Sequence, residues 1–481
     1  MRQTLRNLTL LLSIVLLGLA TSCEKSETSS FAVPSESILV KMPGDSGTTN
    51  FDSSNIASIE VTSIPKGWVV NDINLYEGTI TVTAPTSFDD EEKMDGNLTL
   101  TGYTPTGNTE KVTIYVAILQ NADVDYTQSP ANSYIASKPE TRYLFNPYVG
   151  GSSTPLATES IEILWQTKRD LIKYLDLRDG KASFYLEMAV NDDDEELNEV
   201  YAGNALIGAR NAEGELIWSW HIWVTNSDPT AEVITLNGKT LMNLNLGADC
   251  NSNGEKNGDK IFNSYGMYYQ WGNKTPLVGP FSWNFSGNED DAMYDIEDER
   301  VELQYEASSA STGTIEWSIA NPVAIIKGNP DNDYDWLYAE HDNTLWSESH
   351  KSENDPCPAG WRIPDSSIYS TLTISATDDA INWQEAQGMY GWHLEDTATG
   401  NTHFFSAAGR RNYLDGRLDI VNTNPVRPVP WSGYYWTTTT DGNDAVAMYF
   451  NLNSTTRTWN GFDAHYPMHR ANALPVRCVK E

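Results

Sequence analysis

Basic side chains are scarce in this chain. Lys and Arg supply 31 of its 481 residues, whereas Asp and Glu supply 66, and the formal net charge is −35. Such a negative field repels phosphate backbones, so nucleic acid is not an expected partner. The sequence also lacks a His-Glu-x-x-His pair, a glycine-rich phosphate loop and a Gly-x-Ser-x-Gly elbow. Each of these is the local signature of an enzyme class, so we expect a protein that is not an enzyme.

Cysteine is equally rare, with four residues in the chain. The first, Cys23, follows two Arg, an apolar run over residues 8–20 and a few small residues, which is the pattern of a secretory signal. The apolar run is too short to span a membrane stably. A Cys directly after small residues at the cleavage point resembles the lipobox of bacterial lipoproteins, in which that Cys becomes lipid-modified and N-terminal.

This resemblance makes residues 1–22 a lipoprotein signal peptide, Cys23 a lipid anchor and residues 23–30 a tether. It implies a surface-exposed protein of the outer membrane that touches the membrane only through its lipid. The alternative is a plain secreted protein whose signal happens to contain a Cys. In either case at most one intrachain disulfide can form among the three cysteines that remain after cleavage.

The chain length corresponds to about three domains. Residues 31–120 alternate apolar side chains with Thr, as in Thr79–Thr83 and Val112–Val116, and turn residues separate these runs. Period two with polar residues outward indicates half-buried strands of an antiparallel sandwich. The stretch resembles the small immunoglobulin-like modules of surface proteins from Bacteroides-type bacteria.

A second β-sandwich is predicted over residues 121–228. Its strands include Ser160–Trp165 and the aromatic run Leu216–Trp223, which follows a hairpin turn at Asn211–Gly214. His221 lies among the aromatic residues of that run, and we expect it to be packed and hydrogen-bonded rather than a ligand.

From residue 229 to residue 481 the composition changes to Trp, Tyr, Asn and Gly with short apolar runs. The stretch contains Gly266-Met-Tyr-Tyr-Gln-Trp-Gly272, Asp355-Pro-Cys-Pro-Ala-Gly-Trp-Arg-Ile-Pro364 and Leu474-Pro-Val-Arg-Cys-Val479. In this order they resemble the Fibrobacter succinogenes major paralogous domain of Bacteroidetes surface lipoproteins, including fimbrillin-associated ones. The resemblance implies an α+β C-type-lectin-like domain after two immunoglobulin-like β-sandwiches, in a mainly β protein.

The same resemblance bears on the cysteines. Because the two chain ends of a C-type-lectin-like fold lie side by side, it implies a disulfide between Cys357 and Cys478 and leaves Cys250 free.

One loop of this region has oxygen-bearing side chains at alternate positions. Asp249, Asn251, Asn253 and Asn257 match the opening of an EF-hand-type loop, which makes calcium the candidate cofactor. Lys260, however, stands where such a loop has its bidentate Glu. A solvated turn is the competing interpretation.

These features predict a non-enzymatic surface binding protein or adhesin whose ligand is a glycan or host matrix. Sugar rings stack on aromatic side chains, and planar polar groups bind their hydroxyls. The last part of the chain offers such groups at Trp431, Tyr434, Tyr435, Trp459, Asn460 and His465. One alternative is a structural or tip subunit of a fimbria, with other pilus subunits as partners. A further alternative is a formylglycine-generating-type enzyme or a polysaccharide-utilisation accessory protein.

Overall fold

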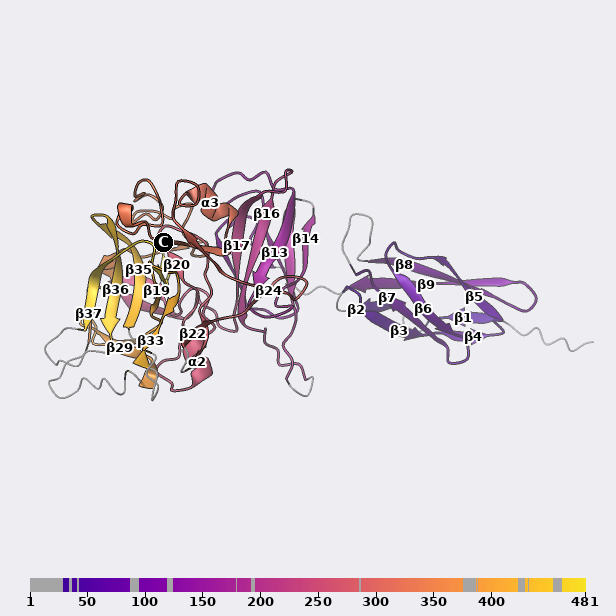
Figure 1. Cartoon of the computed structure of the whole chain (residues 1–481). Coiled ribbons are helices and arrows are strands. Elements are labelled where there is room, and N and C mark those ends of the chain that lie inside the picture. Colours follow the sequence, from indigo (N-terminus) through magenta and orange to yellow (C-terminus); the bar gives the residue numbers. More distant parts are fainter. Residues whose placement is uncertain are drawn as a thin grey trace, which may run out of the picture. The chain divides into compact units, whose positions relative to one another are not determined.

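The chain folds into two compact units, residues 1–120 and residues 121–481, as a computed structural model shows (Figure 1). The structure describes residues 29–33, 37–40, 43–86, 95–118, 124–178, 180–191, 195–284, 287–374, 386, 388–422, 429–430, 432–452 and 461–481. Nearly all elements are strands, so the expectation of a mainly β protein is confirmed. Over these ranges no helix is both long and apolar enough to cross a membrane.

The first unit is a β-sandwich. One sheet has the order β2-β9-β8-β5 and another the order β3-β7-β6, while β1 pairs with β4. The strands are β1 Ser30–Ala32, β2 Ser37–Val40, β3 Ser46–Asn50, β4 Asp52–Ser54, β5 Ser58–Ser63, β6 Val69–Asn74, β7 Thr79–Thr83, β8 Asp95–Tyr103 and β9 Thr109–Ile118.

The predicted alternation places the core of this sandwich. Ile80 and Val82 on β7 are completely buried, whereas the Thr residues between them are only half-buried. Leu98 and Leu100 on β8 and Ile114 on β9 join the same core. Apolar burial on one face of each strand therefore holds the two sheets together.

A second β-sandwich opens the second unit. One sheet has the order β10-β12-β15-β14 and the other the order β11-β17-β16-β13-β23-β24. The strands are β10 Val124–Asp125, β11 Ser133–Ala136, β12 Thr141–Phe145, β13 Ser160–Gln166, β14 Lys173–Arg178, β15 Lys181–Leu186, β16 Gly203–Arg210, β17 Leu216–Val224, β23 Met293–Tyr294 and β24 Arg300–Val301. The expected hairpin turn between β16 and β17 is present, closed by Gly214 N donating to Asn211 O at 2.9 Å.

The rest of the second unit consists of short sheets and irregular loops. In the sheet of order β18-β19-β39-β27, the first two strands of this region lie beside its last strand, β39. The strands of these sheets are β18 Val233–Leu236, β19 Lys239–Met242, β20 Tyr269–Gln270, β21 Pro280–Asn284, β22 Gly287–Asp290, β25 Gln304–Ala307, β26 Ala324–Lys327, β27 Trp361–Arg362, β28 Leu372–Ile374, β29 Gly391–Asp396, β30 Thr402–Ser406, β31 Arg410–Arg411, β32 Leu418–Asp419, β33 Val421–Asn422, β34 Val429–Pro430, β35 Ser432–Asp441, β36 Asp444–Asn451, β37 Phe462–Met468, β38 Ala473–Leu474 and β39 Val479–Lys480. The helices are α2 Gly258–Asn263, α3 Ile315–Ala320, η1 Pro330–Asn332 and η2 Ser366–Tyr369.

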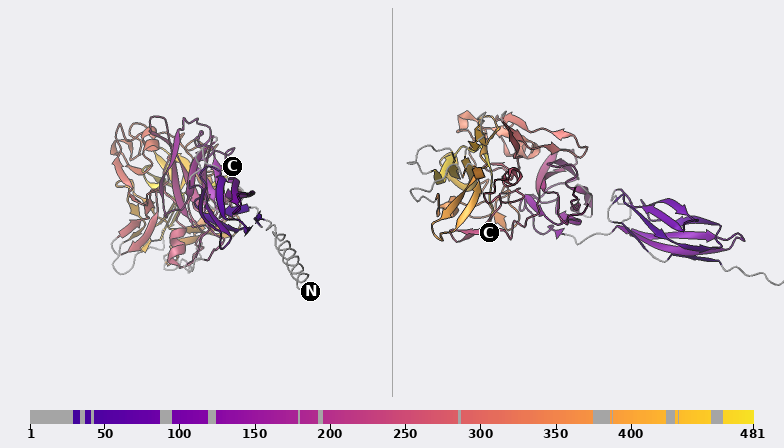
Figure 2. Two further views of the ribbon diagram at one scale, coloured as in Figure 1. Left: turned by 90° about the vertical axis from the view of Figure 1, so that its right-hand side faces the viewer. Right: turned by 90° about the horizontal axis from the view of Figure 1, so that it is seen from below.

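The structure does not separate the chain at residues 228 and 229, where we expected a domain boundary. Strand β23 belongs to the later region but completes the sheet of the second sandwich, where Gln166 of β13 pairs with Tyr294. Figure 2 shows the magenta strands of this sandwich and the orange and yellow strands of the later region as one body. Because the two regions share this sheet, residues 121–481 form one unit and not a sandwich followed by a separate C-terminal domain.

Candidate functional site

Strand β17 joins the second sandwich to the later region because both of its faces are buried. Trp218, Trp220 and Ile222 pack into the sandwich core. Trp223, on the other face, packs with Met242 and Trp271 of the later region. A strand that is apolar at nearly every position is typical of burial on both sides. The aromatic run of residues 216–223 is therefore the seam of the unit.

His221 lies in this seam and is only 1% exposed. Its Nε2 lies 2.8 Å from Asn204 Oδ1, and its Nδ1 lies 3.2 Å from the hydroxyl oxygen of Tyr269. These contacts fit a neutral ring that donates from Nε2 and accepts at Nδ1. Burial lowers the pKa of His221 to about 3. The expectation of a packed, hydrogen-bonded His is confirmed.

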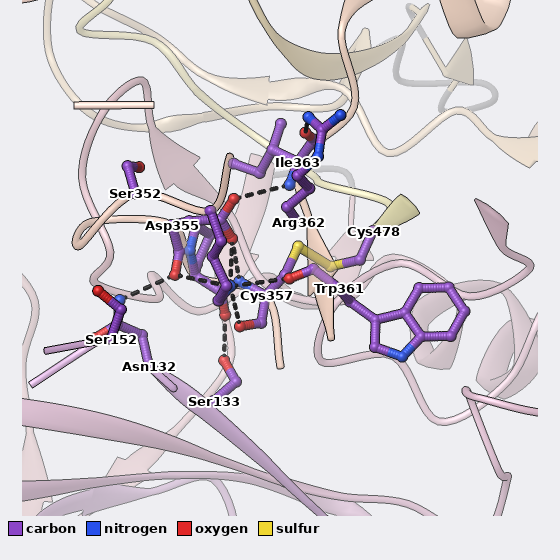
Figure 3. Close-up of polar contacts among 12 residues, drawn as sticks. Asn132, Ser133, Ser152, Ser352, Asp355, Cys357, Trp361, Arg362, Ile363 and Cys478 are labelled. Carbon is purple, nitrogen blue, oxygen red and sulfur yellow. Dashed lines mark hydrogen bonds and ion pairs between the residues drawn. A yellow bond between two sulfur atoms is a disulfide. The ribbon is translucent and has the colours of Figure 1, made fainter. Parts of the chain in front are cut away.

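The segment around Cys357 forms bonds to both regions of the second unit (Figure 3). The expected disulfide between Cys357 and Cys478 is present, and Cys250 is free. The Asp355 carboxylate accepts from Cys357 N at 2.8 Å and from Ile363 N at 2.9 Å. Lys351, whose side chain is 9% exposed, forms an ion pair with that carboxylate at 2.8 Å. These contacts fix the Cys-Pro motif as a rigid structural loop.

Ser133 of β11 and Asn132, which directly precedes that strand, bind the same loop from the sandwich. Asn132 Nδ2 donates to the carbonyl oxygens of Glu353 at 2.7 Å and Asp355 at 2.9 Å, and Ser133 Oγ donates to Pro356 O (Figure 3). The seam and this loop together give the two regions a fixed relative position. A groove between them is therefore preformed.

Such a groove of about 1270 Å³ opens between the second sandwich and the later region. Its buried lining residues form the floor, and among them are Asn204, Gly247, Tyr265 and Met267. The exposed lining residues form the rim. These come from the loop of residues 189–203, from α2 and from the segment of residues 279–302.

The floor is held by hydrogen bonds that cross between the two regions. Asn204 Nδ2 donates to Gly247 O at 3.0 Å, and Trp223 Nε1 donates to Ala248 O at 2.8 Å. The Asp249 carboxylate accepts from Asn226 N at 3.2 Å. These bonds place the loop of residues 247–249 beside the ends of β16 and β17.

Tyr201 is the exposed aromatic side chain of the groove. It is 39% exposed, and its hydroxyl accepts a hydrogen bond from Val190 N at 3.0 Å. Asn226 holds the neighbouring Val200 from both sides, accepting from its N–H at 2.8 Å and donating to its carbonyl at 3.0 Å. The ring of Tyr201 is therefore fixed in place while part of its surface faces solvent.

A second aromatic ring, Tyr294 on β23, also lines the groove. The guanidinium of Arg169 covers one face of this ring at 4.1 Å from its centroid. Asn263, which is exposed at the end of α2, adds an amide to the lining. The lining therefore combines aromatic rings with polar groups around them.

The lining carries more negative than positive charge. Five carboxylates stand against two cations, and one cation, Arg300, pairs with the Glu302 carboxylate at 2.8 Å. Lys168 is the other. The groove therefore has the same sign of charge as the whole chain.

Of the ligand residues expected from the sequence, the structure describes Tyr434, Tyr435 and His465, and these three have different surroundings. Tyr435 is fully buried, and its hydroxyl donates to Ser406 O at 2.9 Å, so we were wrong to expect it at a ligand. It belongs to a core because β35 turns that face toward Phe405 and Met448. His465 is exposed on β37, with Nδ1 3.3 Å from Ser366 Oγ. Trp431, Trp459 and Asn460 lie outside the described residues.

Tyr434 lies on the opposite face of β35 from Tyr435, in a cluster of three tyrosines in which Tyr434 and Tyr466 are half-buried and Tyr449 is buried. Its ring centroid is 5.0 Å from that of Tyr449, which in turn stacks on Tyr466 at 4.4 Å. Burial raises the pKa of Tyr434 to about 12. Tyr434 and Tyr466 pack against the core of the later region.

Three of the four residues of the calcium candidate have side chains with different partners. Asp249 binds Asn226 N, Asn251 Nδ2 donates to Asn243 O at 2.9 Å, and Asn257 caps α2 by accepting from Asp259 N at 3.0 Å. Lys260 pairs with Glu255 at 2.8 Å. Within the described ranges, no three His, Cys, Asp or Glu side chains gather in a way that could hold a metal ion. The loop is organised by hydrogen bonds between its own side chains and the backbone.

The fold defines a mainly β protein with at least two β-sandwiches. No protein-family model matches the chain, and no curated protein is significantly similar to it. Among solved structures it is similar to the D00-D0 domain of intimin, with 11% identity over 40% of this chain and 96% of that chain and a TM-score of 0.18. It is also similar to the BIgI domain of the beta protein from S. agalactiae, with 14% identity over 20% and 98% and a TM-score of 0.14.

A third similar structure is SGBP-B of the Bacteroides ovatus mixed-linkage glucan utilization locus in complex with a mixed-linkage heptasaccharide. The identity is 12% over 41% of this chain and 45% of that chain, with a TM-score of 0.12. Likenesses of this size define neither the fold nor the function of this chain.

Proposed function

We propose that the protein is a surface lipoprotein, anchored through Cys23, that binds a glycan in the groove without chemically changing it. The observation that carries this is the preformed groove of about 1270 Å³ with the fixed ring of Tyr201 in its lining. Pockets for small drug-like ligands have about 300 to 1,000 Å³, so this groove has room for a ligand of several sugar units.

The fold supports the same proposal. A rigid pair of regions with a groove between them is a common location for a binding site. The finer fold assignments, immunoglobulin-like for the sandwiches and C-type-lectin-like for the later region, are part of the proposal. Pairing of β19 with β39 supports the latter, because it brings the start and the end of that region together.

A neutral-oligosaccharide array with the full chain tests the proposal, followed by calorimetry on Tyr201→Ala. Loss of one stacking ring should weaken binding by about 1 to 3 kcal/mol, by analogy with bases stacked on aromatic rings. Tyr76→Ala is the matched control, because Tyr76 is 98% exposed in the first unit and should leave the affinity unchanged. Equal affinities for both variants and the wild type would place the site elsewhere.

Tyr201→Phe separates the ring from its hydroxyl. It keeps the stacking surface but removes the acceptor of the Val190 N–H bond, so we expect a smaller loss than for Tyr201→Ala. Mass spectrometry of the bound oligosaccharide after prolonged incubation tests the non-enzymatic part. Intact ligand supports it, and shortened or modified ligand would contradict it.

A further inference from the structure

We infer that the groove selects uncharged glycans and rejects those that carry carboxylate or sulfate groups. This inference rests on the proposed function and adds the substrate class to it. It comes from the balance of charges in the lining, where five carboxylates stand against two cations.

The two cations of the lining do not neutralise this excess of negative charge where a sugar would bind. Arg300 is held by Glu302 through a contact of 2.8 Å between its Nε and the carboxylate. Lys168 is exposed, and among the described residues no carboxylate of the lining forms an ion pair with it within 4 Å. An anionic sugar would thus have a single lysine available in the lining as a counter-charge.

The lining carboxylates are half-buried or exposed, and they come from several segments of the chain. Asp249 is half-buried two residues from Gly247 of the floor, and its carboxylate accepts from Asn226 N at 3.2 Å and from Thr225 Oγ1 at 3.3 Å. Glu199 and Asp259 are exposed at the rim, on different segments. A chain of uronic acids lying in the groove would bring like charges close together, and such juxtaposition is destabilising.

Neutral sugars form favourable interactions with the same carboxylates. A carboxylate accepts hydrogen bonds from sugar hydroxyls, and these charge-assisted bonds are stronger than neutral ones. The apolar face of the same ring can stack on Tyr201. The lining therefore attracts a hydroxyl-rich uncharged ligand and repels its oxidised counterpart of nearly equal shape.

The experiment compares a neutral glycan with its own oxidised form. The neutral hexose oligosaccharide that binds best on the array is oxidised at C6, which converts primary hydroxyls into carboxylates and leaves the linkage unchanged. Calorimetry with the full chain should show at least about tenfold weaker binding of the oxidised form at low salt. The difference should shrink at high salt, because about 1 M salt shortens the screening length to roughly 3 Å.

A double variant connects the discrimination to the groove. Glu199→Gln with Asp259→Asn removes two exposed rim charges, and the ratio of neutral to oxidised affinity should fall about 2- to 5-fold per charge. Glu213→Gln with Asp331→Asn is the matched control, since both residues are exposed and neither lines the groove. This control should leave the ratio unchanged.

The outcomes separate the inference from the proposed function. Equal or tighter binding of the oxidised glycan, or a ratio that the groove variant does not alter, overturns the inference while leaving a glycan-binding protein. A lack of binding to any neutral or anionic oligosaccharide overturns the proposed function, and the inference falls with it.

Discussion

Lys274 is a buried cation that should make the stability of the second unit depend on pH. It is 3% exposed, its Nζ donates to Ser219 O at 2.9 Å and to Ser219 Oγ at 2.8 Å, and it lies 4.5 Å from the ring centroid of Trp218. Burial lowers the pKa of this ammonium group from 10.5 to about 7, against the opposing effect of the Glu353 charge.

The sign of the effect follows from proton binding. Below pH 7 the lysine is protonated in both the folded and the unfolded chain, so the folded state bears the full cost of a desolvated charge. Between about pH 7 and pH 10.5 only the unfolded chain holds the proton, so a rise in pH disfavours unfolding. From pH 6 to pH 9 this single group should raise the free energy of unfolding by about 3 kcal/mol.

Urea denaturation of the wild type and Lys274→Met at both pH values measures this effect. Tryptophan fluorescence reports on the right unit, because Trp68 is the only one of the 16 Trp residues before residue 121. The substitution leaves Ser219 O without this donor, which should cost about 1 to 3 kcal/mol at either pH. The stability of the variant relative to the wild type should then fall by about 3 kcal/mol from pH 6 to pH 9.

The wild type and the variant share all other titratable groups, so the pH dependence that those groups cause cancels when the two stabilities are subtracted. The exposed Lys239 provides the control, since Lys239→Met should show no such change between the two pH values. A stability difference between Lys274→Met and the wild type that stays constant with pH would refute the reasoning, because it would mean that the Lys274 charge is not desolvated in the folded state.

Three other measurements bear on the structure. Because burial lowers the pKa of His221 to about 3, the free energy of unfolding should fall by about 1.4 kcal/mol per pH unit as the pH falls from about 6.5 toward 3. Urea titrations should show a weaker dependence on pH over this range for His221→Gln. Replacing Cys357 and Cys478 by Ser should destabilise the second unit by roughly 4 to 5 kcal/mol in the chain-entropy model, with an unchanged stability as the contrary result. Cys23→Ser should move the protein from the membrane fraction to the soluble fraction, and unchanged retention would contradict the lipid anchor.

Local sequence patterns predicted much of the secondary structure. Thr79–Thr83 forms β7 with the bounds expected, and the hairpin at Asn211–Gly214 connects β16 to β17. Both predictions depend on interactions among residues that are close along the chain, namely the alternation of a strand and the geometry of a turn. The disulfide between Cys357 and Cys478 was predicted through a resemblance, which carries long-range information.

The candidate site was harder to predict because its lining comes from distant segments. Asn204, Gly247 and Tyr294 meet at the groove although nothing in their neighbourhoods signals it. One available signal was overlooked, namely that the aromatic run of residues 216–223 is apolar on both faces. Such a strand needs a second partner, and that requirement could have predicted the fusion of the two regions.

By itself, then, the sequence determined the mainly β character, the strands whose alternation is clear and the negative charge of the molecule. Tertiary structure alone decided which aromatic side chains are exposed. Tyr435 and Tyr201 both occur in strand-like or loop-like surroundings, but the first faces Phe405 across a core whereas the second has its hydroxyl held by Val190 at the edge of a groove. The physical reason is that exposure depends on which distant segment covers a residue, and that is settled only when the whole unit packs.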